Sequence, residues 1–334
     1  MTASWRPLCR LLGALLLAGS AQTLAQPLEE LALRAALPVE GMAAGNLSGL
    51  ARCGDGQWWA VSDREDDRLY RLQPAAQQWQ AEAQAFAAPP PPPSGLPWGL
   101  RVGSRLLAPL RGGVVDFEGL ACDGAGNRYL LSESQLAVLE LPTFGAPRWL
   151  PLPPELLRQA RARGLLLHFN ALLEGLAVQP DGQRLWLAAE RESRGLLAVQ
   201  RERDGWRCAA RGCVLLAEGG LAQRPPSAAD SPALALDFTG LSWHAGRLYS
   251  LERQQHRICR RDPDSAAIER CWSFAAAALA PAQRYPTAYG VAEALWLDDG
   301  AAWVGLDNGG LANAAGERRP VILQLAAPPG GWSG

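Results

Sequence analysis

Short apolar runs alternate with glycine-centred turns along this chain, and one such arrangement is clearest at Asp116-Phe-Glu-Gly-Leu-Ala-Cys-Asp-Gly-Ala-Gly-Asn-Arg-Tyr-Leu-Leu-Ser-Glu133. The pattern predicts a strand, a turn near Gly124 to Gly126, and a second strand, because a turn that needs positive φ favours glycine. Antiparallel pairing then returns the chain on itself. Glu118 at the start of the first strand and Glu133 at the end of the second are therefore expected to lie side by side.

The same hairpin recurs, with its glycine turn near the midpoint of each copy. The other copies span residues 46–63, 173–190, 238–252 and 292–307. A further strand follows each hairpin, and several copies have a fourth, such as Ala267 to Phe274. Repeated units of four antiparallel strands are typical of a β-propeller. We expect an all-β propeller of five or six four-stranded blades, with Trp98 to Leu110 and the terminal segments as the source of a sixth.

The first residues have the features of an export signal. Arg6 and Arg10 precede the apolar run Leu11 to Ala18, and Thr23-Leu-Ala25 offers small residues before a cleavage point. The run is too short to cross a membrane, and no later segment is apolar enough to do so. The sequence predicts a signal peptide at 1–25, a single propeller domain at 26–334 interrupted by a short helix over 153–163, and a periplasmic or secreted location.

Six cysteines follow the predicted signal, an even number that favours disulfides in an exported chain. Cys53 and Cys122 occupy nearly equivalent places in successive repeats, Cys208 and Cys213 can close a short loop, and Cys259 and Cys271 flank a turn. We expect the pairs 53–122, 208–213 and 259–271. The alternative is that these thiols are free and buried.

Charge and motifs narrow the function classes. The formal net charge is −1, and the absence of a basic surplus argues against a nucleic-acid partner. The sequence contains no Gly-x-Ser-x-Gly elbow, no phosphate-binding loop and no His-Glu-x-x-His motif.

The hairpin ends concentrate carboxylates at one mouth of the propeller. The residues at the start of the first strand of each hairpin are Ser48, Glu118, Glu174, Thr239 and Glu293. The residues at the end of the second strand are Asp63, Glu133, Glu190, Glu252 and Asp307. Two like charges about 6 Å apart repel by roughly 3 kcal/mol at an effective dielectric near 20. Dense oxygen ligands suit Ca²⁺. The predicted metal ligands are Asp63, Glu118, Glu133, Glu174, Glu190, Glu252, Glu293 and Asp307.

Other side chains at the mouth are candidates for substrate binding. Arg64, Arg191 and Arg253 each follow a mouth carboxylate, where they either neutralise it or bind a phosphate or carboxylate ligand. His168 precedes Asn170 and Glu174 and is expected to reach the mouth. The alternative for the whole ring is architectural, with each acid accepting hydrogen bonds from exposed amides of its own or the next blade.

The elements Leu-Glu-Gly-Leu-Ala, Asp-Phe-Glu-Gly-Leu-Ala-Cys-Asp-Gly, Val-Ala-Glu-Ala-Leu-Trp and Gly-Leu-Asp-Asn-Gly resemble those of the phytase-like propeller family, "esterase-like activity of phytase", over residues 45–325. The resemblance implies an acidic, Ca²⁺-dependent phosphoesterase site at the matching positions, which are Glu118, Glu174, Glu293, Asp63, Glu133, Glu190 and Asp307. Ala294, Ser48 and Thr239 depart from the pattern. The phosphate-binding lysines of calcium phytases have no counterpart here, which argues against phytate itself.

These observations predict an exported, calcium-binding, monomeric hydrolase of a small phosphorylated or ester substrate. Glu174, Glu118 and Glu293 are the predicted catalytic residues, one of which positions or deprotonates a water in metal-assisted hydrolysis. Two alternatives stay open at this point: a non-catalytic propeller that binds a ligand or partner, and a lactonase-type hydrolase.

Overall fold

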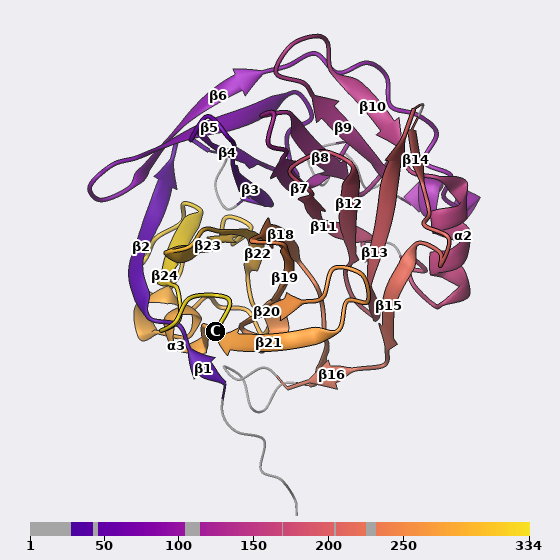
Figure 1. Ribbon diagram of the computed structural model, residues 1–334. Helices are drawn as coiled ribbons and strands as arrows, with labels where there is room; N and C mark the ends of the chain where they lie inside the picture. Colours follow the sequence, from indigo (N-terminus) through magenta and orange to yellow (C-terminus); the bar gives the residue numbers. More distant parts are fainter. Residues whose placement is uncertain (1–27, 43–45, 104–113, 169, 204, 225–231) are drawn as a thin grey trace, which may run out of the picture.

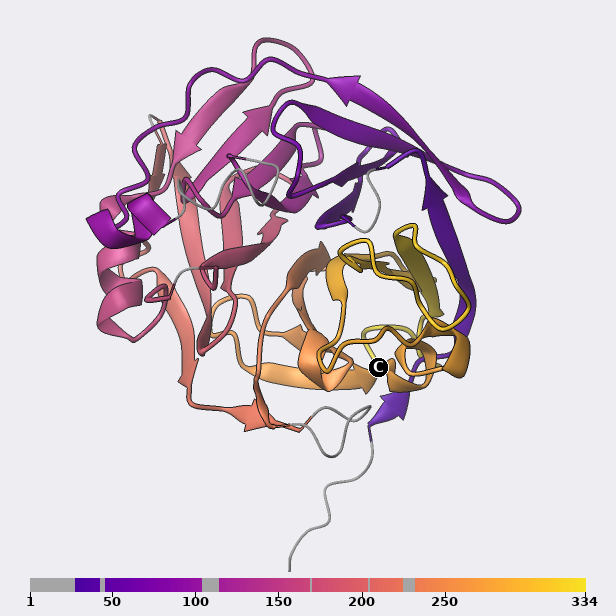
Figure 2. The ribbon, with the colours of Figure 1, turned by 180° about the vertical axis from the view of Figure 1, so that it is seen from behind.

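Five blades of β-strands surround a central axis (Figures 1 and 2). The computed structural model describes residues 28–42, 46–103, 114–168, 170–203, 205–224 and 232–334. The predicted propeller is confirmed, and the described residues form five blades. The predicted signal peptide lies outside the described residues.

Blades 1 to 3 follow one another along the chain. Blade 1 consists of β3 (Gly49–Arg52), β4 (Trp58–Val61), β5 (Arg68–Pro74) and β6 (Trp79–Ala85). Blade 2 consists of β7 (Phe117–Cys122), β8 (Arg128–Ser132), β9 (Ala137–Leu141) and β10 (Arg148–Pro151). Blade 3 consists of β11 (Leu173–Val178), β12 (Arg184–Ala189), β13 (Ser193–Glu202), β14 (Gly205–Arg207) and β15 (Val214–Gly219), of which the last two both pair with β13.

Blades 4 and 5 contain the two ends of the described chain. Blade 4 consists of β18 (Gly240–His244), β19 (Arg247–Glu252), β20 (Arg257–Arg261), β21 (Ile268–Ser273) and β1 (Glu29–Glu30). Blade 5 consists of β22 (Ala292–Leu297), β23 (Ala301–Leu306), β24 (Val321–Ala326) and β2 (Leu33–Glu40). The remaining elements are β16 (Ala222–Gln223), β17 (Leu234–Ala235), α2 (Pro154–Ala162), α3 (Ala275–Ala278), η1 (Arg253–Gln255) and η2 (Pro281–Gln283).

The N-terminal segment closes the ring. Residues 28–40, whose sequence is ambiguous between strand and helix, form β1 and β2. β2 pairs antiparallel with β24, and its end at Val39–Glu40 runs parallel to β6 of blade 1. β1 runs parallel to β21. Indigo and yellow-orange strands are therefore neighbours in Figure 1. A sixth blade is not needed for closure, and residues 98–103, part of the segment expected to supply it, are helical.

The inner strands β3, β7, β11, β18 and β22 stand next to one another around the axis. Glycines permit this close approach. A Cβ added at Gly49 would lie 2.8 Å from the backbone nitrogen of Leu120, and one added at Gly240 would lie 2.8 Å from the carbonyl oxygen of Glu293. The strands leave a central space of about 10 Å³, enough for one water molecule or ion. The axis is thus a packed core rather than a wide channel.

Apolar faces of neighbouring blades pack together, and disulfides add covalent links. Trp186 of β12 stacks on Trp243 of β18, with 4.5 Å between the ring centroids. The disulfides are Cys53–Cys122, Cys208–Cys213 and Cys259–Cys271, which are the predicted pairs. The first joins blades 1 and 2. The predicted helix at 153–163 is present as α2. Within the described residues, none of the helices is long and apolar enough to cross a membrane.

Candidate active site at the mouth of the propeller

Three glutamates enter the mouth on β-bulges. In β7 the register with β8 shifts between Phe117 and Gly119, which leaves Glu118 as the extra residue. The same shift in β11 and β22 leaves Glu174 and Glu293 as the extra residues. A bulge redirects a side chain and is common beside active sites. The bulges therefore aim these three carboxyl groups toward the axis, where all three line the central space and are partly exposed.

The inner strands of blades 1 and 4 do not begin with a glutamate. Ser48 and Thr239 take the place of the glutamates, and each donates its backbone N–H to the end of the second strand, to Val61 and Leu251 respectively. The Ser48 hydroxyl accepts a hydrogen bond from the Asp63 backbone N–H at 3.2 Å. Thr239 donates its hydroxyl to the Ala292 carbonyl of blade 5 at 2.8 Å. These two positions thus serve the architecture of the ring.

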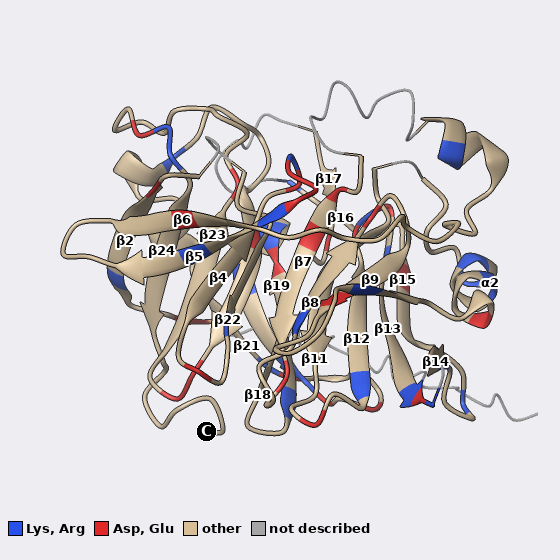
Figure 3. Ribbon diagram, turned by 90° about the horizontal axis from the view of Figure 1, so that it is seen from above, with Lys and Arg blue, Asp and Glu red and all other residues tan. Residues whose placement is uncertain are grey.

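Carboxylates of blades 1 and 2 form a compact group. Asp63, Asp116 and Glu118 each offer an oxygen, and these oxygens all lie within 4.8 Å of one another. Asp63 also accepts a hydrogen bond from the Asn46 side-chain amide at 3.1 Å and pairs with Arg64 at 3.1 Å. We call Asp63, Asp116 and Glu118 the blade 1–2 acid group. Figure 3 shows acidic segments (red) at the start of β7 and the end of β19.

Electrostatics in this group favour a cation. Burial raises the pKa of Glu118 well above its ordinary value, and the nearby charges of Asp116 and then Asp63 raise it further. A like charge disfavours ionisation and an opposite charge restores it. A cation among these oxygens would therefore lower the pKa of Glu118 and hold the group in its ionised form.

A buried arginine neutralises the other side of the mouth. Arg253, which follows β19, donates from Nε to Asp237 at 2.8 Å, from Nη1 to Glu293 at 2.5 Å and from Nη2 to Glu190 at 2.9 Å. Burial opposes the charge of this guanidinium, but Asp237, Glu174, Glu293 and Glu190 together raise its pKa well above the ordinary value. We call Arg253 and its three hydrogen-bonded carboxylates the Arg253 cluster.

Two pairs of carboxyl groups interact electrostatically at the mouth, Glu293 with Asp307 and Glu174 with Glu190. Burial, followed by the charge of Asp307, raises the pKa of Glu293 well above its ordinary value. Burial, followed by the charge of Asp63, raises the pKa of Asp307 to about 7. Glu174 has its pKa raised by burial and then by the Glu190 charge. In each pair, the charge of one carboxyl group disfavours ionisation of the other.

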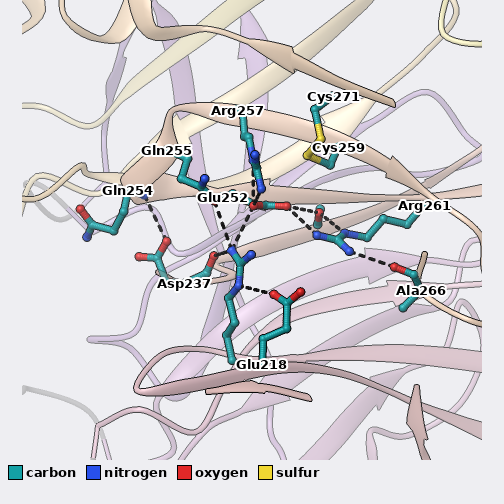
Figure 4. Close-up of polar contacts among 12 residues, drawn as sticks. Glu218, Asp237, Glu252, Gln254, Gln255, Arg257, Cys259, Arg261, Ala266 and Cys271 are labelled. Carbon is teal, nitrogen blue, oxygen red and sulfur yellow. Dashed lines mark hydrogen bonds and ion pairs between the residues drawn. A yellow bond between two sulfur atoms is a disulfide. The ribbon is translucent and has the colours of Figure 1, made fainter. Parts of the chain in front are cut away.

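Glu252 lies in a different environment from the other predicted ligands (Figure 4). It is fully buried and pairs with Arg257 at 2.6 Å, Arg261 at 2.7 Å and Arg194 at 3.0 Å. Burial alone would raise the pKa of Glu252, but these three guanidinium groups outweigh it and lower the pKa. Because three positive charges already surround this carboxylate, we leave Glu252 outside the proposed metal site.

Glu133 links two blades. It is buried, and its Oε1 accepts the backbone N–H of Leu172 at 2.9 Å. This contact, from the end of β8 to the residue before β11, is the architectural hydrogen bond considered as the alternative for the ring. Glu133 thus has a partner of the architectural kind.

The four predicted substrate-binding residues are placed differently. The side chains of Arg64 and Arg191 are 38% and 33% exposed and pair with Asp63 and Glu190, the acids that precede them. Arg191 also donates to the Asn170 carbonyl at 2.6 Å, which ties the exposed segment around His168 to the mouth. Arg253 is buried and uses each of its three nitrogens on a carboxylate, and its predicted role with substrate stays a prediction.

Asp116 and Asp237 are site residues that the sequence reasoning missed. Both are buried, at the position two residues before the glutamate or threonine of the inner strand. Asp116 has positive φ, 62°, which is uncommon for a non-glycine residue and marks a constrained position. The signal was the repeated sequence Asp-Phe-x-Gly, at 116–119 and 237–240. Both aspartates precede the inner strands, so the pairing of strand residues does not point to them.

Comparison with known proteins supports the fold. Glutaminyl cyclase from Myxococcus xanthus aligns with a TM-score of 0.51 at 14% identity, over 91% of this chain and 100% of that one. A gluconolactonase from Xanthomonas campestris aligns with a TM-score of 0.39 at 10% identity, over 88% and 98%. Aldose sugar dehydrogenase from Streptomyces coelicolor gives 0.42 at 14% identity, over 87% and 98%. At these identities the similarity concerns the fold alone.

A search of curated protein sequences gives no significant match. The sequence profile of one family, whose description is "esterase-like activity of phytase", matches residues 42–306. This range begins ahead of β3 and ends with β23, so it includes the inner strand of every blade. The chain therefore belongs to the phytase-like family.

Proposed function

We propose that this protein is an exported, calcium-dependent hydrolase that cleaves small phosphorylated or ester substrates at the mouth of the propeller. The observation that carries the proposal is the blade 1–2 acid group, in which three carboxylate oxygens converge within 4.8 Å. Membership of the phytase-like family supports hydrolysis. The three disulfides support export, because such bonds persist in oxidising compartments.

The residues of the blade 1–2 acid group fit a calcium ion. Asp63, Asp116 and Glu118 present only hard oxygen donors, which Ca²⁺ prefers, and carboxylates of this kind supply most of its protein ligands. The central space beside Glu118 accommodates a body the size of a water molecule. When bound there, the ion would neutralise negative charge on a phosphate or ester oxygen of the substrate.

Proton transfer is assigned to the neighbouring carboxyl pair. A general base works best when its pKa is near the working pH, and the pKa of Asp307 is about 7. Asp307 as carboxylate would accept a proton from the attacking water as the water oxygen bonds to phosphorus or carbonyl carbon. Glu293, whose raised pKa favours the protonated form, would give its proton to the leaving alkoxide as the ester bond breaks. Glu174 and Glu190 form a second pair of the same kind.

Arginine side chains at the mouth would hold an anionic substrate. Arg64 and Arg191 are partly exposed at the mouth, and each guanidinium carries five N–H donors. A guanidinium binds phosphate or carboxylate with two parallel hydrogen bonds. His168, on the exposed segment that Arg191 contacts through Asn170, is proposed to line the same approach.

Calcium titration and turnover assays test the proposal together. Calcium should raise the melting temperature of chelator-treated protein, and p-nitrophenyl phosphate, phytate and a simple lactone should separate phosphatase, phytase and lactonase activity. Glu118→Gln and Asp116→Asn should abolish the calcium response. Asp299→Asn, at a fully exposed position in the turn at the opposite end, is the control. A calcium response without turnover of any ester would favour the non-catalytic alternative, and no calcium response would overturn the proposed metal site.

A further inference from the structure

A second pocket opens beside the acidic mouth. Its volume is about 110 Å³, and it lies under the segment that leads from α3 through η2 to β22. The lining residues that matter below are His256, Ala278, Gln283, Tyr285, Tyr289 and Leu306. None of them belongs to the blade 1–2 acid group or to the Arg253 cluster.

The walls of this pocket combine apolar and aromatic side chains with polar ones such as Arg284 and Thr287. Leu279, Val291 and Leu306 supply aliphatic surface, and Tyr285 and Tyr289 supply two rings. The Tyr289 side chain is notable because the residue is 52% exposed in the described structure. Large aromatic side chains left exposed beside a pocket commonly contact a ligand. The aliphatic and aromatic residues suit a flat apolar ring, and the polar residues suit a hydroxyl group on that ring.

Three polar atoms at the pocket lack hydrogen-bond partners. One is the Tyr285 hydroxyl. The other two are acceptors: His256 is only 5% exposed, yet its Nδ1 is buried and unpaired, and so is Oε1 of Gln283. Burial lowers the pKa of His256, so the imidazole is neutral near pH 7 and one of its nitrogens is an acceptor. A buried polar atom without a partner is costly and rare. A ligand that brings a hydroxyl donor would satisfy either acceptor.

The pocket is next to the proposed site of hydrolysis. Val291 and Ala292 line it and directly precede Glu293, and Leu306 directly precedes Asp307. Gly290 forms the contact between the two regions, since a Cβ there would lie 2.9 Å from the Arg253 carbonyl oxygen and 3.2 Å from Cε1 of His256. A ligand in the pocket is thus one residue away along β22 from the carboxyl pair.

We propose that this pocket binds an aromatic alcohol, the organic part of an aryl ester whose ester group lies at the acidic mouth. The volume is of the order of the ~150 Å³ cavity that accepts benzene in a designed case. A sugar ring of similar size carries more hydroxyl groups than the three unpaired atoms of His256, Gln283 and Tyr285 can serve. A phenol needs one such partner for its hydroxyl group, and its ring packs against the apolar part of the pocket. The link to ester cleavage rests on the proposed function; binding of the ring does not.

Direct binding of phenol to chelator-treated protein tests the pocket without requiring catalysis. Calorimetry should show saturable binding of phenol, and weaker or no binding of glucose. Ala278→Trp, which fills the pocket from α3, should weaken phenol binding at least tenfold. Ala276→Trp on the exposed side of the same helix is the matched control and should bind as the unaltered protein does. His256→Phe keeps the ring but loses the nitrogen, and should weaken binding roughly three- to tenfold, the factor for one hydrogen bond.

Turnover separates this inference from the proposed function. With calcium, kcat/KM for phenyl phosphate should exceed that for methyl phosphate, and Ala278→Trp should remove the difference while Ala276→Trp keeps it. Saturable phenol binding without turnover of either ester would support the pocket and overturn the proposed hydrolysis. Absence of phenol binding, equal binding by Ala278→Trp, or tighter binding of glucose than phenol would overturn the pocket.

Discussion

Arg253 donates a hydrogen bond to Glu293 across the boundary of blades 4 and 5, with 2.5 Å between Nη1 and Oε1. The same guanidinium also binds Glu190 of blade 3 and Asp237, so one buried cation joins three blades. Removing one partner of a buried ion pair leaves uncompensated charge and costs about 3–5 kcal/mol. Arg253→Met should therefore lower the free energy of unfolding by about that amount near pH 7, measured by urea denaturation without calcium.

Arg247→Met is the control for that loss. Arg247 is about half exposed and pairs with Glu269, so its removal should cost less than about 1 kcal/mol. The loss for Arg253→Met should shrink at lower pH, where the carboxyls of the Arg253 cluster become protonated. Equal losses for the two variants at neutral pH would contradict the assigned role of Arg253.

The pH dependence of stability follows from Asp307. Its pKa in the folded protein is about 7, against 3.8 for an ordinary aspartate. Between these values the folded state binds a proton that the unfolded state has lost, so stability falls as pH rises. In chelator, the melting temperature should decrease from about pH 5 to about pH 8, and Asp307→Asn should flatten this decrease. A melting temperature that rises over the same interval would be inconsistent with the raised pKa.

The stabilising effect of calcium should increase with pH, whereas the stability of the calcium-free protein should decrease. Carboxylate ligands must be ionised to bind a metal, so the ion competes with protons for the acids of the mouth. Its stabilising effect should therefore be larger near pH 8 than near pH 5. The measurement is the difference in melting temperature with and without calcium at each pH.

The sequence predicted the repeat and the ring of acids because both are local. Glycine turns, apolar alternation and the acids at hairpin ends recur in each copy, and the positions of Cys53 and Cys122 in neighbouring copies indicated their disulfide. The partners of those acids are not local. Arg194 reaches Glu252 from β13 of another blade, and Arg253 reaches Glu190 and Glu293 across blade boundaries. Such pairings depend on how blades are oriented, which no hairpin pattern specifies.

Glu252 and Glu118 should respond differently to loss of charge. Glu252→Gln would deprive the guanidinium groups of Arg194, Arg257 and Arg261 of this buried carboxylate, and should cost about 3 kcal/mol or more in stability. The increase in melting temperature with calcium should remain. Glu118→Gln should lose that increase instead. Differential scanning calorimetry of both variants, with and without calcium, makes the comparison, and a lost calcium response in Glu252→Gln would return this acid to the metal site.

The disulfides should differ in their contribution to stability. Cys53 and Cys122 are separated by 69 residues and Cys208 and Cys213 by 5. A longer closed loop restricts the unfolded chain more, and the chain-entropy relation gives about 4 kcal/mol for the first and about 2 for the second. Replacing both cysteines of each pair by serine, followed by urea denaturation, should give losses in that order. Because Cys53–Cys122 lies at the end of the strands away from the mouth, its removal should leave the calcium response intact, and the reverse order of losses would count against this explanation.

Gly240 sets the distance between blades 4 and 5 at the mouth. A Cβ there would lie 2.8 Å from the Glu293 carbonyl oxygen and 3.3 Å from the Leu295 nitrogen, both backbone atoms that cannot rotate away. Gly240→Ala should therefore push β22 outward, lower stability by about 1–3 kcal/mol, and reduce kcat because Glu293 moves with its strand. Gly99→Ala is the control, since an added Cβ there meets nothing within 4 Å. Ala294, at the equivalent position of blade 5, shows that one interface of the ring accommodates a methyl group. If Gly240→Ala changed neither stability nor turnover, close approach of the inner strands would not be what positions Glu293.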